Sequence, residues 1–289
     1  MSPSLRGGLW LMGAALSFTL MTAFIREAAL HIHPFEIAFV RVVVNLVLLL
    51  PFLLKTGRGI FRSENHKAYL FRGCLGFIFL ISYFQGAALV PVSDSQALIF
   101  TSPLFAALLA VLFLGEKVHA HRTSALAVGF CGALIILRPG FDTVNVGALL
   151  VLVAALMNAA SNIVVRHTTR TDHPDKVVFY LMAWTLPLIS IPAFFVWKTP
   201  DLEQLLLMVG VGVFATFNQR CLSRAFAIAE ATAILPFDFT RLIFATLVGW
   251  LAFSEIPDLW VWVGGAVIFG ASVYITRREA KIAPNSHAP

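Results

Sequence analysis

Hydrophobic residues form long uninterrupted stretches of this chain, and short polar segments separate them. The apolar runs cover residues 9–25, 35–54, 69–90, 94–114, 122–138, 145–165, 177–197, 204–226, 231–253 and 259–276. A helix needs roughly 20 apolar residues to cross a bilayer, and each run has about that length. The pattern therefore predicts an all-α integral membrane protein with ten transmembrane helices.

The composition excludes several other classes of protein. Of the 289 residues, 59% are hydrophobic and 12% are charged, whereas a soluble domain carries about 25% charged residues. A soluble enzyme, a disordered chain and a coiled coil are excluded on this ground, and three cysteines give no disulfide framework. Ten spans leave no room for a soluble domain, so the function must lie inside the bilayer or on short loops.

Positive charges are concentrated in alternate loops. If the N-terminus is cytoplasmic, the cytoplasmic segments hold 16 of the 21 lysines and arginines, and the outer segments hold only Arg26, Arg138 and Lys198. Cytoplasmic loops of membrane proteins carry such an excess. We therefore expect a multi-pass membrane protein with both termini in the cytoplasm. Because the net charge of +6 is spread over these loops, it does not indicate nucleic acid.

An internal repeat divides the chain. FTSPLFAALLAVLFLGE at 100–116 matches FTRLIFATLVGWLAFSE at 239–255 at seven of seventeen positions, with an offset of 139 residues. The Thr and Glu matches carry most weight, because Phe, Ala and Leu recur in any membrane sequence. Each segment is the fourth helix of a five-helix half. Since five is odd, the second half enters the membrane the opposite way up.

This arrangement predicts two inverted five-helix repeats, at 8–140 and 145–276. Inverted repeats are typical of secondary transporters. Two similar halves of opposite orientation can exchange conformations, which gives inward-open and outward-open states of similar energy.

Several short motifs add a family resemblance over residues 8–276. They are HPFEIAFVR at 33–41, SPLFA at 102–106, LGEK at 114–117, RPG at 138–140, PFDFTR at 236–241 and SE at 254–255. With these motifs the chain resembles the EamA branch of the drug/metabolite transporter superfamily, which implies a ten-helix carrier without a cofactor. Ser254 stands where the family usually has glycine. The pair Asp238 and Arg241 is similar to that of a subset that includes riboflavin and S-adenosylmethionine carriers.

Polar residues inside the predicted spans are the candidate substrate-binding residues. A charge at mid-membrane costs roughly 2.5–3.5 kcal/mol on insertion scales, so such residues need a reason. The candidates are Arg41, Tyr83, Gln85, Thr101, Ser102, Asn158, Asn162, Asn218, Asp238 and Arg241. We expect them to face a polar central cavity. Hydrogen bonding between helices remains the alternative for the amides and hydroxyls.

The charged candidates each leave two roles open. Arg41 either contacts an anionic substrate or gate, or makes a structural tie to Glu36 or to a helix end. Asp238 and Arg241 are three residues apart on one helix face. They either neutralise each other, or bind a zwitterion or relay a proton. Pro236 precedes this pair and Pro103 lies in the matching helix, and paired helix breaks in two halves point to a transporter's binding site.

Other candidate features have simpler interpretations. Glu116 and Glu255 end matching helices, where an interfacial position is favoured over proton coupling. The pairs His31 with His33 and His119 with His121 lack the further ligands of a metal site, so we predict no metal. Small residues in the fifth and tenth helices, such as Gly132 and Gly264, allow close helix packing and leave a homodimer open.

The sequence therefore predicts a secondary transporter. An intramembrane enzyme is disfavoured by the absence of GxSxG, HExxH and Asp-rich motifs, a channel by the absence of a filter motif, and an ATP-driven pump by the absence of a P-loop. Charges of both signs beside aromatic residues suit a zwitterionic or aromatic solute. We expect export of an amino-acid-like metabolite across a bacterial inner membrane, with uptake of a vitamin or nucleoside-like cofactor as the alternative.

Overall fold

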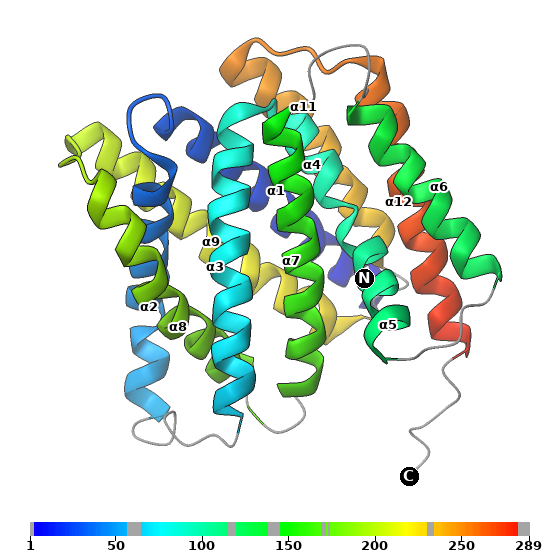
Figure 1. The fold of residues 1–289 in the computed structure, drawn as a ribbon, viewed down its shortest axis with the longest axis horizontal. Coiled ribbons are helices and arrows are strands. Elements are labelled where there is room, and N and C mark those ends of the chain that lie inside the picture. Colours follow the sequence, from blue (N-terminus) through cyan, green and yellow to red (C-terminus); the bar gives the residue numbers. More distant parts are fainter. Residues whose placement is uncertain are drawn as a thin grey trace.

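The computed structural model describes residues 3–56, 65–114, 120–137, 145–168, 172, 174–229 and 234–282 of the chain. Every element in these ranges is helical (Figure 1). The elements are α1 (Pro3–Ala28), α2 (Pro34–Thr56), α3 (His66–Leu89), α4 (Val92–Ile99), α5 (Ser102–Leu114), α6 (Ala120–Leu137), α7 (Val146–Thr168), α8 (Pro174–Val196), α9 (Leu202–Ile228), the 3-10 helix η2 (Leu235–Phe239), α11 (Thr240–Phe253) and α12 (Leu259–Ile282). The expectation of an all-α protein is confirmed.

Seven segments of the described chain are long and apolar enough to cross a membrane. Six of them lie within α1, α2, α3, α7, α8 and α9, and the seventh, Val92–Leu109, runs through α4 into α5. Two shorter apolar helical segments are Ser124–Leu137 in α6 and Leu259–Tyr274 in α12. These helices make the chain a multi-pass membrane protein.

The predicted helix at 94–114 is interrupted in the structure. α4 ends at Ile99, and α5 begins at Ser102. Pro103 has no N–H to donate to the carbonyl of Ile99, so the helical ladder cannot continue unbroken. Thr101 closes the break, because both its N–H, at 3.0 Å, and its hydroxyl, at 2.7 Å, donate to the carbonyl of Leu98.

The predicted helix at 231–253 is also divided, between η2 and α11. The 3-10 turn has Pro236 near its start, where a missing N–H is tolerated. The hydroxyl of Thr240 donates to the carbonyl of Phe237 at 2.7 Å. The residues of this bond lie 139 positions beyond Thr101 and Leu98, so the two breaks are held by the same kind of hydrogen bond.

Helices distant in the sequence pack side by side. α1 lies against α9 and α11, α7 lies against α3 and α5, and α2 lies against α8. At the right-hand side of Figure 1, α6 packs along α12. Gly132 and Gly264 allow this last approach, since a Cβ on Gly132 would lie 2.9 Å from the carbonyl oxygen of Gly264.

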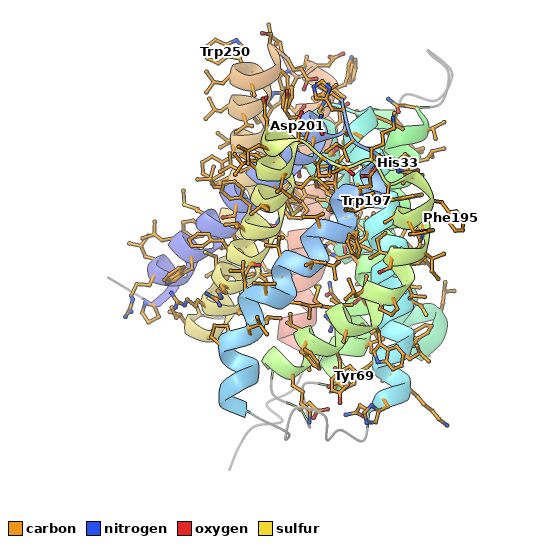
Figure 2. The ribbon with its side chains drawn as sticks, turned by 90° about the vertical axis from the view of Figure 1, so that its left-hand side faces the viewer. His33, Tyr69, Phe195, Trp197, Asp201 and Trp250 are labelled. Atoms are coloured by element: carbon orange, nitrogen blue, oxygen red, sulfur yellow. The ribbon has the colours of Figure 1, made fainter. Side chains whose placement is uncertain are left out.

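Polar contacts tie helices together near both ends of the bundle. Figure 2 places Tyr69 near one end and His33, Trp197 and Asp201 toward the other. At the Tyr69 end, Asp172 accepts hydrogen bonds from the hydroxyl of Tyr69 at 2.7 Å and from the amide of Asn65 at 3.1 Å. It also pairs with Lys176 at 2.8 Å. These contacts fix the start of α3 against α8.

At the other end, Arg26 of α1 forms an ion pair with Glu255, which follows α11. The buried carboxylate of Glu36 accepts the backbone N–H of Lys198 at 3.0 Å, which holds the start of α2 against the segment after α8. The central helices are therefore tied at both ends in this conformation.

Candidate functional site

A buried hydrogen-bond network lies where α1, α3 and α4 meet. The hydroxyls of Thr22 and Tyr83 lie 2.7 Å apart, and the side-chain amide of Gln96 donates to Thr22 at 2.8 Å. All three side chains are fully buried. Their hydroxyl and amide groups satisfy one another in part, which lowers the cost of holding them away from water.

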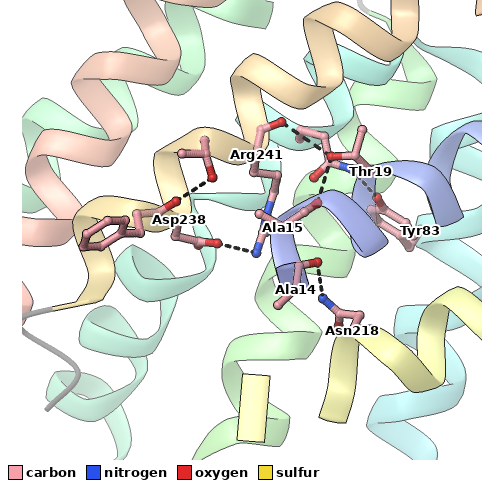
Figure 3. Close-up of polar contacts among 10 residues, drawn as sticks. Ala14, Ala15, Thr19, Tyr83, Asn218, Asp238 and Arg241 are labelled. Carbon is pink, nitrogen blue, oxygen red and sulfur yellow. Dashed lines mark hydrogen bonds and ion pairs between the residues drawn. The ribbon is translucent and has the colours of Figure 1, made fainter. Parts of the chain in front are cut away.

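The charged pair Asp238 and Arg241 lies beside this network (Figure 3). A guanidinium nitrogen of Arg241 lies 2.8 Å from a carboxylate oxygen of Asp238. The guanidinium carbon lies 4.9 Å from the ring centre of Phe18 and 5.4 Å from that of Phe100. Both rings stabilise the cation through their π faces. Asp238 belongs to η2 and Arg241 to α11, so the pair bridges the helix boundary.

Arg41 approaches the network from α2. Its guanidinium carbon lies 5.7 Å from the ring centre of Phe84, and Arg41 and Arg241 are both close enough to Tyr83 to interact with it electrostatically. The tie between Arg41 and Glu36, one of the two roles left open by the sequence, does not form in this structure. Glu36 accepts from the backbone of Lys198 instead.

Other predicted residues lie around this centre. The amide of Asn158 in α7 donates to the hydroxyl of Ser102 in α5 at 3.1 Å. Thr101 is fully buried at the break between α4 and α5. The amide of Asn218 in α9 donates to the carbonyl of Ala14 in α1 at 2.8 Å (Figure 3). Asn218 thus ties two helices together.

Two predicted residues stand apart from the network. Gln85 is half-buried on α3, and Asn162 is exposed on α7. Within the described part of the chain, neither forms a hydrogen bond with the residues around Tyr83. Sequence reasoning missed Thr19, Thr22 and Gln96. Thr19 and Thr22 lie three residues apart, which places them on one helix face, and this spacing was the available signal.

Three buried polar atoms around Tyr83 have no hydrogen-bond partner among the described residues. They are Nε of Arg41, Nε of Arg241 and the side-chain oxygen of Gln96. An unmet buried donor or acceptor costs about 1–3 kcal/mol. The site therefore holds two buried cationic donors and one buried neutral acceptor without hydrogen-bond partners among the described residues, bordered by aromatic rings.

A separate hollow of about 600 Å³ lies at the end of the bundle that contains His33. Its lining includes His31, His33, Trp197 and Lys198. In the described residues no group of three His, Cys, Asp or Glu side chains is placed to hold a metal ion. His119 and Glu116 lie outside the described residues.

Comparison with known proteins identifies the class of this transmembrane chain. The sequence profile of the EamA-like transporter family matches residues 5–138 and 145–277. The chain belongs to this family. It is a multi-pass membrane transporter for a small molecule and not an enzyme.

Curated relatives align over nearly their full length. The chain is 33% identical to a riboflavin transporter of Vibrio cholerae serotype O1 over 96% of this chain and 95% of the relative. It is 29% identical to the pseudopaline exporter of Pseudomonas aeruginosa, over 92% and 94%. It is 27% identical to the S-adenosylmethionine uptake transporter of Rickettsia prowazekii, over 98% and 96%.

A crystal structure with 16% sequence identity superposes with a TM-score of 0.63, covering 96% of this chain and 98% of that one. This likeness shows that the two chains share a fold.

Proposed function

We propose that this protein is a secondary transporter that exports a small amino-acid-like zwitterion across the bacterial inner membrane by alternating access. The observation that carries the proposal is the Asp238–Arg241 pair, which is held beside a buried hydroxyl and amide network. A zwitterion presents one charge of each sign, so it can exchange partners with this pair without leaving a charge uncompensated.

Alternating access needs two halves that can exchange conformations, and the helix breaks support such a repeat. We count α4 with α5 as one span and η2 with α11 as another, which gives ten spans in two five-helix halves at 8–140 and 145–276. The two family matches have nearly the same bounds. α2 and α8, the second helices of the halves, both begin at a proline, Pro34 and Pro174.

Matching contacts between helices also support the repeat. Phe18 and Asn158 differ by 140 positions, and Ser102 and Arg241 differ by 139. Phe18 contacts Arg241 in one interface, and Asn158 contacts Ser102 in the other. The two interfaces therefore correspond in geometry. One contains the cation–π contact of Arg241 with Phe18, and the other contains the neutral hydrogen bond from Asn158 to Ser102.

Close glycine contacts repeat with the same offsets. A Cβ on Gly7 would lie 2.8 Å from Ala229, and a Cβ on Gly147 would lie 2.8 Å from Val90. Gly7 and Gly147 are 140 positions apart, and Val90 and Ala229 are 139 apart. The contact of α1 with the end of α9 therefore matches the contact of α7 with the end of α3, and a glycine lies at the closest point of each.

α6 and α12 contact each other reciprocally. A Cβ on Gly129 would touch Ala271, and a Cβ on Gly132 would touch Ile268. Ile268 and Ala271 lie 139 positions beyond Gly129 and Gly132. Reciprocal contacts of this kind arise when a two-fold axis relates two elements. They support a pseudo-two-fold relation between the halves.

Uptake of a vitamin or nucleoside-like cofactor is the second candidate function. Two observations favour it. The rings of Phe18 and Phe100 border Arg241, which suits a planar solute, and relatives that align along the whole chain are a riboflavin transporter and an S-adenosylmethionine uptake transporter.

Loop charge supports our proposed orientation in the membrane, and glycine packing supports a proposed homodimer. The excess of lysine and arginine in alternate loops supports cytoplasmic termini. In Figure 1 the turns after α1, α3, α8 and α11 lie at the upper end, which is then the outer side. Gly132 and Gly264 are used in packing α6 on α12, whereas Gly270 has no neighbour within 4 Å of a Cβ and is available to a second copy.

The proposed function is tested by thermal stabilisation of the purified protein with amino acids, riboflavin and S-adenosylmethionine, followed by flux in proteoliposomes. A solute at a hundredfold excess over its Kd stabilises the protein by about 2.7 kcal/mol. We expect an amino acid to stabilise the protein and to leave vesicles loaded with it. Stabilisation by riboflavin or S-adenosylmethionine alone would favour the second candidate, and no flux of any solute would refute both.

A further inference from the structure

Arg41 has no counter-charge among the residues that the structure describes. In the described part of the chain no carboxylate forms an ion pair with Arg41, and its Nε is buried without a hydrogen-bond partner. The other arginine of the site, Arg241, is neutralised by Asp238. A lone charge in the membrane interior is costly, so Arg41 needs a functional or structural reason.

The tie to Glu36 is not formed at this position. Glu36, the carboxylate nearest in sequence on α2, lies about 140° from Arg41 around the helix, given 3.6 residues per turn. It accepts a hydrogen bond from Lys198 instead. The repeat places Leu181 at the position that matches Arg41, 140 residues later. The second half thus folds with an apolar residue there, so the shared fold does not need an arginine.

The surroundings of Arg41 suit an anionic partner. The face of Phe84 lies 5.7 Å from its guanidinium carbon and stabilises the cation without neutralising it. The hydroxyl of Tyr83 belongs to the buried network with Thr22 and Gln96. A planar guanidinium binds a carboxylate through two parallel hydrogen bonds, which fits an acidic group better than a neutral one.

We propose that Arg41 binds an acidic group of the transported solute, so that the protein selects solutes with a carboxylate or a similar anionic group over their neutral analogues. This inference rests on the proposed transport function. It assigns the acidic group of the solute to Arg41, and the Asp238–Arg241 pair receives the cationic group of the solute at Asp238.

The test uses pairs of solutes that differ only in the acidic group. The purified full-length protein is titrated with the twenty amino acids and with their carboxamides, and thermal stabilisation is measured for each pair. We expect at least one acid to bind, and its carboxamide to bind roughly 10- to 100-fold more weakly, which is the loss expected for a charged hydrogen bond. This comparison requires no variant and cannot be confused with misfolding.

Three variants then assign the preference to a residue. Arg41→Gln is expected to abolish the difference between acid and carboxamide, and Arg41→Lys to retain part of it. Arg224→Gln is the matched control, because Arg224 is an exposed arginine that lies over the ring of Trp10. Arg224→Gln also removes one positive charge, but outside the site, so it should leave the preference for acids over carboxamides unchanged.

The outcomes separate this inference from the proposed function. Equal binding of acids and carboxamides, or a preference that persists in Arg41→Gln, overturns the role of Arg41 while transport stands. If a neutral solute is transported and no acid binds, the selectivity is wrong and the protein is still a transporter. If no solute in the set is bound or transported, both proposals fail.

Discussion

The ring of Phe100 stacks on the ring of Phe239, with centroids 6.3 Å apart and planes inclined by 19°. These two residues match each other in the internal repeat, 139 positions apart. A contact between matched residues places them where the pseudo-two-fold axis of our proposal passes. Phe100 also contacts Arg241. The stack therefore connects the substrate-binding candidates to the boundary between the two halves.

This stack should show measurable coupling. Phe100→Leu and Phe239→Leu keep apolar volume and remove the ring–ring contact, which is worth about 0.5–1.5 kcal/mol beyond buried area. We expect each single variant to melt at a lower temperature than the wild-type protein. The double variant should lose less unfolding free energy than the sum of the losses in the two single variants. A double-mutant cycle on thermal unfolding measures the coupling.

Phe195→Leu is the control for this cycle, since Phe195 is 80% exposed and, among the described rings, contacts only that of Phe194. Strictly additive effects of Phe100→Leu and Phe239→Leu would contradict the coupling.

Ser254 is expected to be a point of backbone strain. It ends α11 with φ of 54° and ψ of 30°, in the left-handed region that favours glycine. Ser254→Gly should stabilise the protein by up to about 1 kcal/mol, because glycine adopts this conformation without a Cβ clash.

The melting temperature in detergent measures this effect. Ser254→Val serves as the opposite control and should melt at a lower temperature than the wild-type protein. A Ser254→Gly variant that melts at or below the wild-type temperature would contradict the strain argument.

The Arg26–Glu255 ion pair links α1 to the end of α11 at the upper end of Figure 1. Arg26 also lies over the ring of Phe253, with the guanidinium carbon 4.8 Å from the ring centre. Reversing one charge, in Arg26→Glu or Glu255→Arg, places like charges together and should cost about 1 kcal/mol or more in this partly buried location. Thermal unfolding and proteoliposome flux should both be impaired.

The double reversal of Arg26 and Glu255 restores opposite charges, so it should recover much of the loss. If the double variant is as impaired as the worse single variant, the pair does not act through charge.

Gly132 and Gly264 should tolerate no side chain. A Cβ on Gly264 would lie 2.6 Å from the carbonyl oxygen of Gly132, and backbone atoms cannot move aside cheaply. Gly132→Ala and Gly264→Ala should each destabilise the protein by roughly 1–3 kcal/mol, as overpacking does. Gly270→Ala on the same helix as Gly264 is the control, since a Cβ there meets nothing within 4 Å. Equal melting temperatures for Gly264→Ala and Gly270→Ala would refute the close packing of α6 on α12.

The sequence was sufficient to predict the helical class and one pair of the site. Asp238 and Arg241 lie three residues apart, and they bond even though the structure puts a helix boundary between them. A 3-10 turn that leads into an α-helix keeps residues i and i+3 on nearly the same face. The spacing therefore predicted the contact without predicting the local geometry.

The residues that complete the site could not be found in this way. Thr22 and Gln96 are 74 positions apart, and only the packing of α1 on α4 brings them together. A threonine in an apolar helix can equally bond to its own helix backbone, as Thr22 also does with the carbonyl of Phe18 at 2.9 Å. Likewise, the short spacing from Glu36 to Arg41 suggested a tie, whereas the segment after α8 supplies the partner of Glu36.

The single charge of Arg41 has an electrical consequence. Moving one elementary charge across a membrane potential of 100 mV changes its energy by about 2.3 kcal/mol. A zwitterionic solute has no net charge, so the site carries one positive charge, that of Arg41, both when it is empty and when it is loaded. Membrane voltage then acts equally on the crossing of the loaded transporter and on the return of the empty one, so it changes the rates of both steps while the solute gradient alone sets the direction of net flux.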